Sequence, residues 1–165
     1  MLKNDFYVYV LLNPLKPGKF YYPWLNMSFL YEPFYVGKGR KQRIAEHFHK
    51  PSPSVLSNPK FNKMKHAIVN EILSEQKKPI GIKLYQNLIE ESSFELERFH
   101  IFLIGKKIDN RGPLTNMTSG GEGSFGIKRS EETKKKLSIL NSGKNILSFF
   151  GRFFNLINYI LNMNL

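Results

Sequence analysis

The 165-residue sequence contains no cysteine and few acidic residues. Without cysteine, disulfide bonds and cysteine-ligated zinc sites are excluded. The four histidines are scattered along the chain, so a metal cluster built from them is not expected. The first residues, MLKNDFYVYV, lack the architecture of a signal peptide and lead directly into a strand pattern. We therefore expect a soluble, non-secreted protein without stable membrane association.

The shortage of acidic residues leaves a large positive charge. Twenty-five Lys and Arg residues against 13 Asp and Glu give a formal net charge of +12. Such a charge attracts polyanions and releases their counterions on binding. Double-stranded DNA is the expected partner and an anionic membrane surface is the alternative, because charge alone does not choose between them. Abundant Asn, Lys, Ile and Phe are typical of an AT-rich genome, so a phage-infected host cytoplasm or an organelle is the expected compartment.

Hydrophobic residues make up 41% of the chain, enough to form a core, and their spacing predicts alternating strands and helices. The predicted strands are residues 6–12, 34–36, and 80–84 or slightly beyond. The predicted helices are residues 40–49, 60–77 and 90–104. Residues 13–33 contain several prolines and are predicted to be a long, partly packed loop.

A glycine-rich stretch divides the chain. Residues 1–118 are predicted to form the main domain and residues 119–127 a linker. Residues 128–144 are basic, and Ser130 followed by two glutamates is typical of a helix start. Residues 145–165 predict an apolar helix of unknown role. A narrow polar stripe disfavours a transmembrane helix there and favours packing, self-association or an altered end of a DNA-binding region.

Two pairs of residues are candidates for chemistry. Tyr9 and Tyr35 lie on strands that could be neighbours, which would bring their hydroxyls close together; each alone also fits a half-buried core position. Arg43 and His47 are four residues apart and would share one helix face. The alternative for this second pair is a solvated basic face.

Glu97 falls within the apolar stripe of the predicted helix 90–104. A carboxylate in such a stripe costs several kcal/mol unless a cation or hydrogen-bond donors compensate it. A metal ion or Arg43 could do so. The alternative is a structural salt bridge.

These residues, taken in order, resemble a known family. Tyr7-Val8-Tyr9 and Phe34-Tyr35-Val36-Gly37 resemble the two halves of the signature of GIY-YIG endonucleases. Arg43, His47, Glu97 and Asn116 match the arginine, histidine, glutamate and asparagine that follow in that family, and the resemblance covers residues 5 to about 123. Two features depart from the pattern: Tyr7 replaces a glycine, and the segment between the two halves is longer than the usual short hairpin.

The resemblance implies an α+β domain with a small antiparallel three-stranded sheet flanked by helices, followed by a short helical DNA-binding extension. It implies hydrolysis of DNA phosphodiesters. Tyr9 would activate water as a general base through its phenolate, with Tyr35 alongside and no indication of which tyrosine leads. Arg43 would stabilise the phosphorane, and His47 would relay a proton or hold the tyrosine. Glu97 would bind one Mg²⁺ or Mn²⁺, and Asn116 would belong to the catalytic set.

The expected DNA contacts lie in two places. Lys38 and Arg40 follow the second half of the signature. Residues 126–144 resemble the modular DNA-binding motif of homing endonucleases, although a solvated lysine-rich helix is the alternative. The candidate contacts there are Lys128, Arg129, Ser130, Lys134, Lys135, Lys136 and Ser138.

Three further functions remain open at this point. The chain could be a DNA-binding protein with an inactive nuclease domain, a basic RNA-binding or structural protein, or a membrane-surface protein that uses its C-terminal helix.

Overall fold

A computed structural model describes residues 5–49, 52, 56–58 and 61–120 of the chain. The chain divides into two compact units, Met1–Gly123 and Ser124–Leu165, and all described residues belong to the first. The predicted basic element 128–144 and apolar helix 145–165 lie outside the described residues, as does the predicted linker beyond residue 120. The boundaries and roles of these segments therefore stay predictions.

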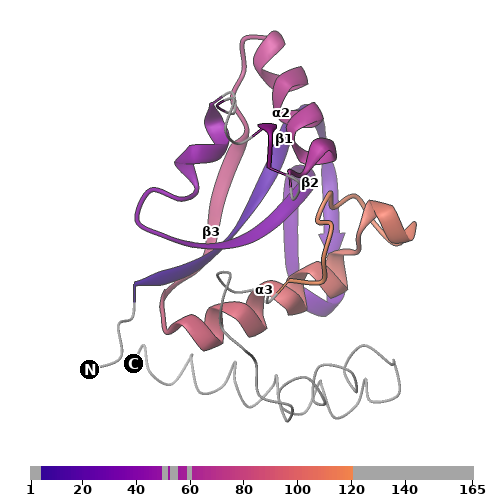
Figure 1. The fold of residues 1–165 in the computed structure, drawn as a ribbon. Helices are drawn as coiled ribbons and strands as arrows, with labels where there is room; N and C mark the ends of the chain where they lie inside the picture. Colours follow the sequence, from indigo (N-terminus) through magenta and orange to yellow (C-terminus); the bar gives the residue numbers. More distant parts are fainter. Residues whose placement is uncertain (1–4, 50–51, 53–55, 59–60, 121–165) are drawn as a thin grey trace. The chain divides into compact units, whose positions relative to one another are not determined.

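The described fold is an antiparallel sheet of three strands with helices packed on it, which confirms the predicted α+β class (Figure 1). The strands are β1 (Phe6–Tyr22), β2 (Met27–Arg40) and β3 (Ile80–Leu88), and their order in the sheet is β2-β1-β3. The α-helices are α2 (Lys63–Ser74) and α3 (Glu90–Ile104). The described residues also form three short 3₁₀ helices: η1 (Pro23–Leu25), η2 (Ala45–Phe48) and η3 (Lys107–Asp109).

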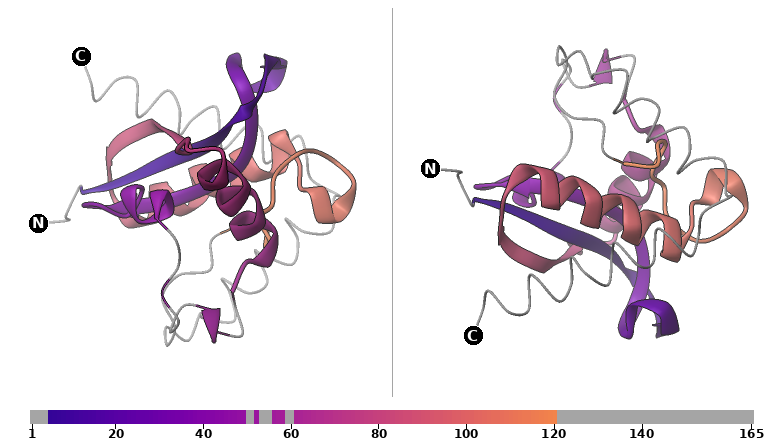
Figure 2. Two further views of the ribbon diagram at one scale, coloured as in Figure 1. Left: turned by 90° about the horizontal axis from the view of Figure 1, so that it is seen from above. Right: turned by 90° about the horizontal axis from the view of Figure 1, so that it is seen from below.

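From Tyr7 to Asn13 the central strand β1 is buried on both faces. Tyr7, Tyr9 and Leu11 form a cluster with Val69 and Ile72 of α2. Successive residues of a strand point to opposite sides, so the intervening valines and Leu12 point to the face that α3 covers. Figure 2 shows α2 and α3 on opposite faces of the sheet. This burial explains the unbroken apolar and aromatic run at the start of the chain.

The prediction of a long loop over residues 13–33 is wrong. β1 and β2 continue through this region as a two-stranded ribbon, closed by η1 and by Asn26 in the left-handed conformation, with φ 48°. β3 pairs with β1 only from Phe6 to Leu12, so beyond that point each strand has a free edge. Proline is tolerated on free edges and at bulges, and the ribbon has register shifts around Pro17.

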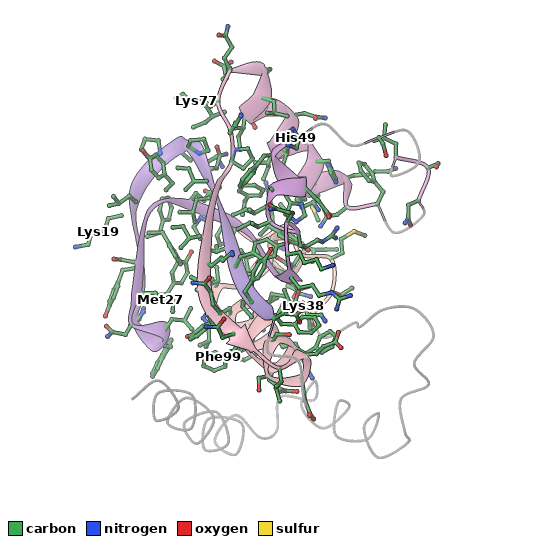
Figure 3. The ribbon with its side chains drawn as sticks, turned by 90° about the vertical axis from the view of Figure 1, so that its left-hand side faces the viewer. Lys19, Met27, Lys38, His49, Lys77 and Phe99 are labelled. Carbon is green, nitrogen blue, oxygen red and sulfur yellow. The ribbon has the colours of Figure 1, made fainter. Side chains whose placement is uncertain are left out.

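The end of this ribbon extends beyond the three-stranded sheet (Figure 2). Lys19 on β1 points away from the rest of the domain there, and Met27 lies at the start of β2 (Figure 3). Tyr21, Trp24 and Leu30 are exposed large hydrophobic residues in the same part of the ribbon.

The helix predicted over residues 40–49 is present only over Ala45–Phe48, as the 3₁₀ helix η2. Lys41 has a positive φ of 52°, and the chain makes successive turns before the 3₁₀ helix η2. The backbone hydrogen bonds join residues three apart, such as Ala45 N–H to Gln42 C=O and His47 N–H to Ile44 C=O. This spacing is that of a 3₁₀ helix rather than of an α-helix.

The remaining predicted elements are present. The helix predicted over 60–77 is α2, which is shorter at both ends and begins at Asn62, whose side chain accepts a hydrogen bond from the Lys65 N–H. The helix predicted over 90–104 is confirmed, with Gly105 (φ 88°) as its C-cap. Within the described ranges, none of the helices has the length and apolar character needed to cross a membrane.

Candidate functional site

Tyr9, Tyr35 and His47 form a compact cluster. Tyr9 pairs with Gly37 and Tyr35 pairs with Leu11 in the register of β1 and β2, so the two tyrosines are diagonal neighbours with ring centroids 6.3 Å apart. The His47 ring lies 5.6 Å from each of them. Its Nε2 is 2.6 Å from the Tyr9 hydroxyl oxygen, and Tyr9 is only 1% exposed. The structure therefore brings these three predicted residues together at one buried polar contact.

Two glycines of β2 make room for side chains of the site, Gly37 for the two tyrosines and Gly39 for Arg43. A Cβ atom at Gly37 would lie 2.7 Å from the Tyr9 hydroxyl and 2.9 Å from the Tyr35 ring. At Gly39 it would lie 2.8 Å from the Arg43 Cβ atom. Close approach of the two rings thus requires glycine at position 37, which explains why the second tyrosine triplet is followed by that residue.

Tyr7 has a role that the sequence did not reveal. Its hydroxyl donates a hydrogen bond to the Lys41 carbonyl at 3.1 Å and accepts one from the Ile44 N–H at 3.0 Å. The turn between β2 and η2 is therefore fixed to β1. The residue that departs from the family pattern in the first triplet holds the segment that carries Arg43 and His47.

Arg43 and His47 differ in burial although both lie in this segment. His47 is buried. The side chain of Arg43 is half exposed, and its guanidinium forms an ion pair with Glu46. The sequence suggests Arg43 as one partner for the Glu97 carboxylate, whereas the ion pair of this guanidinium in the structure is with Glu46.

Glu97 approaches the site from α3. Its Oε1 accepts a hydrogen bond from the backbone N–H of Lys38 at 3.2 Å, so this donor compensates part of the cost of a partly buried carboxylate. The hydrogen bond connects α3 to the strand that carries Tyr35. The charge of Glu97 also acts on the two tyrosines, because it raises the pKa of both hydroxyls.

The pKa values of the cluster are strongly shifted. Burial raises the pKa of Tyr9 well above its usual value and that of Tyr35 to about 12, and the Glu97 carboxylate adds to both shifts while Arg43 opposes them. Burial lowers the pKa of His47 to about 3, and the charges of Lys65 and Arg43 contribute to the same shift. At neutral pH the site therefore contains protonated tyrosines next to a neutral imidazole.

Asn116 is bound to the backbone of β2. Its Oδ1 accepts a hydrogen bond from the Val36 N–H at 3.1 Å, and its Nδ2 donates one to the Val36 carbonyl at 2.7 Å. Thr115 adds two hydrogen bonds to the Phe34 carbonyl, from its N–H and from its hydroxyl. The backbone on both sides of Tyr35 is thereby fixed, so the geometry of Asn116 is that of a positioning residue.

Replacing Asn116 by alanine should lower the free energy of unfolding by about 2–6 kcal/mol, because two buried backbone groups of Val36 would lose their partners at about 1–3 kcal/mol each. Urea unfolding followed by circular dichroism would measure the loss. The exposed neighbour Met117 offers the control Met117→Ala, for which little change is expected. Equal stabilities of the two variants would contradict this role of Asn116.

Lys65 of α2 is a second residue that the sequence analysis missed. It is 8% exposed, its Nζ lies 3.4 Å from His47 Nδ1, and it lies 4.9 Å from the centre of the Tyr35 ring. A signal was present in the sequence: Lys65, Val69 and Ile72 follow the spacing of a buried helix face. A lysine in that apolar stripe indicates a charge that needs a partner, as the position of Glu97 in the predicted helix 90–104 does.

The predicted DNA contacts near the site differ in their surroundings. The Lys38 ammonium forms an ion pair with Glu90 at 2.7 Å and lies 3.5 Å from the centre of the Phe94 ring, and Figure 3 shows Lys38 beside α3. Arg40 is exposed. Lys38 could contact a phosphate only by leaving its ion pair with Glu90, whereas Arg40 is already accessible. DNA contact by Lys38 and by Arg40 stays a prediction. The candidates from Lys128 to Ser138 lie outside the described residues.

A metal centre made only of protein ligands is not present in the described part of the chain, where no three His, Asp or Glu side chains gather. A single carboxylate does fit Mg²⁺, which protein sites hold through one or two carboxylates together with water and substrate phosphates. Glu97 is such a carboxylate, and its oxygen atoms are ligands of the kind that a hard cation prefers.

Comparison with known protein families gives a match of residues 6–157 to the LEM-3-like GIY-YIG domain. The matched range contains every residue of the tyrosine cluster together with Arg43, Glu97 and Asn116. Neither the curated proteins nor the solved structures gave a match.

Proposed function

Because the chain belongs to the LEM-3-like GIY-YIG domain family, and this family points to a nuclease that acts on DNA, we propose that it is a metal-dependent endonuclease that hydrolyses phosphodiester bonds of double-stranded DNA. The observation that carries the proposal is the contact of 2.6 Å between the Tyr9 hydroxyl and His47 Nε2. A buried tyrosine bonded to a neutral histidine is an arrangement for handling the proton of an attacking water.

In this reaction the phenolate of Tyr9, formed when its hydroxyl proton passes to solvent, takes the proton from water and becomes a hydroxyl again. His47 supports the Tyr9 oxygen, while Tyr35 forms the adjacent wall. The Arg43 guanidinium stabilises the negative charge that develops on phosphorus. Its half-exposed position suits contact with a phosphate that arrives from solvent. Asn116 and Gly37 act by holding β2 in the geometry that the two tyrosines need.

Glu97 would hold one Mg²⁺ or Mn²⁺. The bound ion would polarise the scissile phosphate as a Lewis acid. The Lys38 N–H orients the Glu97 carboxylate through Oε1, and this orientation is what the protein contributes to the ion's position.

Incubation of the purified chain with supercoiled plasmid, with and without Mg²⁺, tests the proposed activity. We expect nicked or linear DNA with Mg²⁺ or Mn²⁺ and none when EDTA is added. Binding of the plasmid without cleavage under any metal condition would instead select a DNA-binding protein with an inactive nuclease domain. Preference for RNA would select a basic RNA-binding protein, and binding to anionic vesicles in place of DNA would select a membrane-surface protein.

A homing-endonuclease-like arrangement is part of the proposal and rests on the resemblance of residues 126–144 to a modular DNA-binding motif. The basic residues of this segment would bind phosphates apart from the catalytic cluster. Each phosphate contact contributes about 0.9 to the slope of log K against log salt concentration.

Replacing Lys128, Arg129 and Lys135 together by alanine should therefore weaken DNA binding and make this slope shallower by about one to three units. Fluorescence anisotropy over a salt series would measure both effects. The triple variant Lys19→Ala, Lys77→Ala and Lys78→Ala changes the net charge equally and is the control. Equal losses in the two variants would mean that net charge, and not this segment, determines binding.

A further inference from the structure

Lys65, His47 and Tyr9 form a continuous chain of polar contacts between α2 and β1. Lys65 Nζ faces one ring nitrogen of His47, Nδ1, at 3.4 Å. The other ring nitrogen, Nε2, faces the Tyr9 hydroxyl oxygen at 2.6 Å. Lysine is almost never fully buried unless it has a partner, and His47 is the partner that the geometry gives it.

The protonation of these groups determines the direction of the hydrogen bond to Tyr9. An ammonium group has three donors and no acceptor, so the His47 nitrogen that faces it must be unprotonated. A neutral imidazole carries one proton, which must then lie on Nε2. The hydrogen bond between Nε2 and the tyrosine therefore runs from His47 to the Tyr9 oxygen.

We propose that Lys65 is a positioning residue that sets the tautomer of His47, so that His47 donates its Nε2 proton to the Tyr9 oxygen. The importance of this tautomer for catalysis rests on the proposed endonuclease function. The family pattern left two roles for His47, relaying a proton or holding the tyrosine. With the proton on Nε2, His47 cannot accept the hydroxyl proton of Tyr9, so it holds the tyrosine and stabilises the phenolate that forms when Tyr9 loses its proton to solvent.

The charges around Lys65 support this assignment. The groups that face it are His47 and Glu46 of η2, Arg43 in the preceding turn, Tyr35 of β2 and His66 of α2 itself. Burial lowers the pKa of Lys65 to about 8, with Arg43 contributing to the same shift and Glu46 opposing it. The ammonium is therefore the main form at pH 7. It is lost as the pH rises through about 8, and the constraint on the tautomer is lost with it.

The tautomer can be observed directly by ¹⁵N NMR of the histidine ring nitrogens, with the His47→Gln spectrum used to assign the signals. For the wild-type chain at pH 7 we expect a protonated Nε2 and an unprotonated Nδ1. Raising the pH should convert this pattern into a mixture of tautomers with a midpoint near the Lys65 pKa of about 8. This measurement needs no DNA, so it does not depend on the cleavage activity.

Substitutions at position 65 supply the second measurement. Lys65→Met keeps an unbranched apolar chain and removes the charge, so at pH 7 we expect mixed tautomers and a single-turnover cleavage rate about 10- to 100-fold lower, the range typical of losing a residue that orients a functional histidine. Lys65→Arg keeps a donor and should restore both the tautomer and most of the rate. Lys63→Met removes the same charge from an exposed position of α2 and should change neither.

The tautomer assignment, its importance for catalysis and the proposed endonuclease function are each tested by a separate outcome. A wild-type pattern in Lys65→Met at pH 7 would overturn the assignment of the tautomer to Lys65. Mixed tautomers at an unchanged cleavage rate would overturn its catalytic importance. Absence of cleavage by the wild-type chain would overturn the proposed function alone, because the NMR measurement would still decide the tautomer.

Discussion

Cleavage by Glu97→Gln should be slower than cleavage by the wild-type chain by about 10³-fold or more, while DNA affinity should change little. A metal ion at a phosphate contributes several kcal/mol to the transition state, and each 1.4 kcal/mol corresponds to a factor of about ten in rate. Glutamine keeps the carbonyl oxygen that can accept the Lys38 N–H but is a much weaker ligand for a hard cation. The basic groups that bind phosphates lie elsewhere, so affinity should persist.

Glu95→Gln is the matched control, because Glu95 lies on the same helix, where its half-exposed side chain faces Arg98 at 3.9 Å. Single-turnover cleavage across a Mg²⁺ series, with binding measured separately by anisotropy, would distinguish the two variants. Recovery of Glu97→Gln at high Mg²⁺ would agree with a weakened metal site. A wild-type rate at every Mg²⁺ concentration would eliminate the metal-ligand role.

The sequence predicted correctly those elements whose buried faces follow from local patterns of apolar residues. Residues 90–104 carry an apolar stripe, acidic residues in the first turn and a glycine at the C-terminus, and each of these local signals agrees with α3. The strand at the start of the chain is apolar on both faces because helices cover both sides of the sheet. In these elements local pattern and tertiary environment point to the same structure.

The segments that the sequence mispredicted depend on partners that are distant along the chain. The ribbon over residues 13–33 exists because β1 and β2 pair with each other there, and prolines on free edges do not prevent pairing. The turns before η2 are fixed by Tyr7, which is 34 and 37 residues away from its partners. A helical spacing of Arg43 and His47 could not reveal that contact.

The candidate site also combines features that the sequence could predict with features that depend on tertiary contacts. The order of Tyr9, Tyr35, Arg43, His47 and Glu97 could be recognised, but the sequence could not show which tyrosine contacts the histidine. Pairing in the sheet decides this point, because β1 is the central strand and Tyr9 points toward α2 and η2. The role of the lysine in α2 required knowledge that this helix packs beside the histidine, although its place in an apolar stripe was visible.

Tyr9 is therefore the tyrosine whose loss should matter most. Tyr9→Phe removes one oxygen atom that lies 2.6 Å from His47 Nε2 and leaves the ring that packs against α2. If Tyr9 takes the proton from water, the rate of cleavage should fall by about 10³-fold, within the range of about 10² to 10⁴ for loss of a general acid or base. The free energy of unfolding should fall by about 1–3 kcal/mol, because the buried Nε2–H of His47 loses its acceptor.

Two further phenylalanine variants make this result specific. Tyr35→Phe should lower the rate by only about tenfold, because Tyr35 forms the wall of the site and the proton transfer belongs to Tyr9. Tyr85→Phe removes a hydroxyl from β3, where the ring contacts His100 and not the cluster, and should cleave at the wild-type rate. All three should be compared by single-turnover kinetics at saturating enzyme, with stability measured in parallel. A larger loss in Tyr35→Phe than in Tyr9→Phe would assign the base to Tyr35, and His47 would then support a tyrosine that does not carry the reaction.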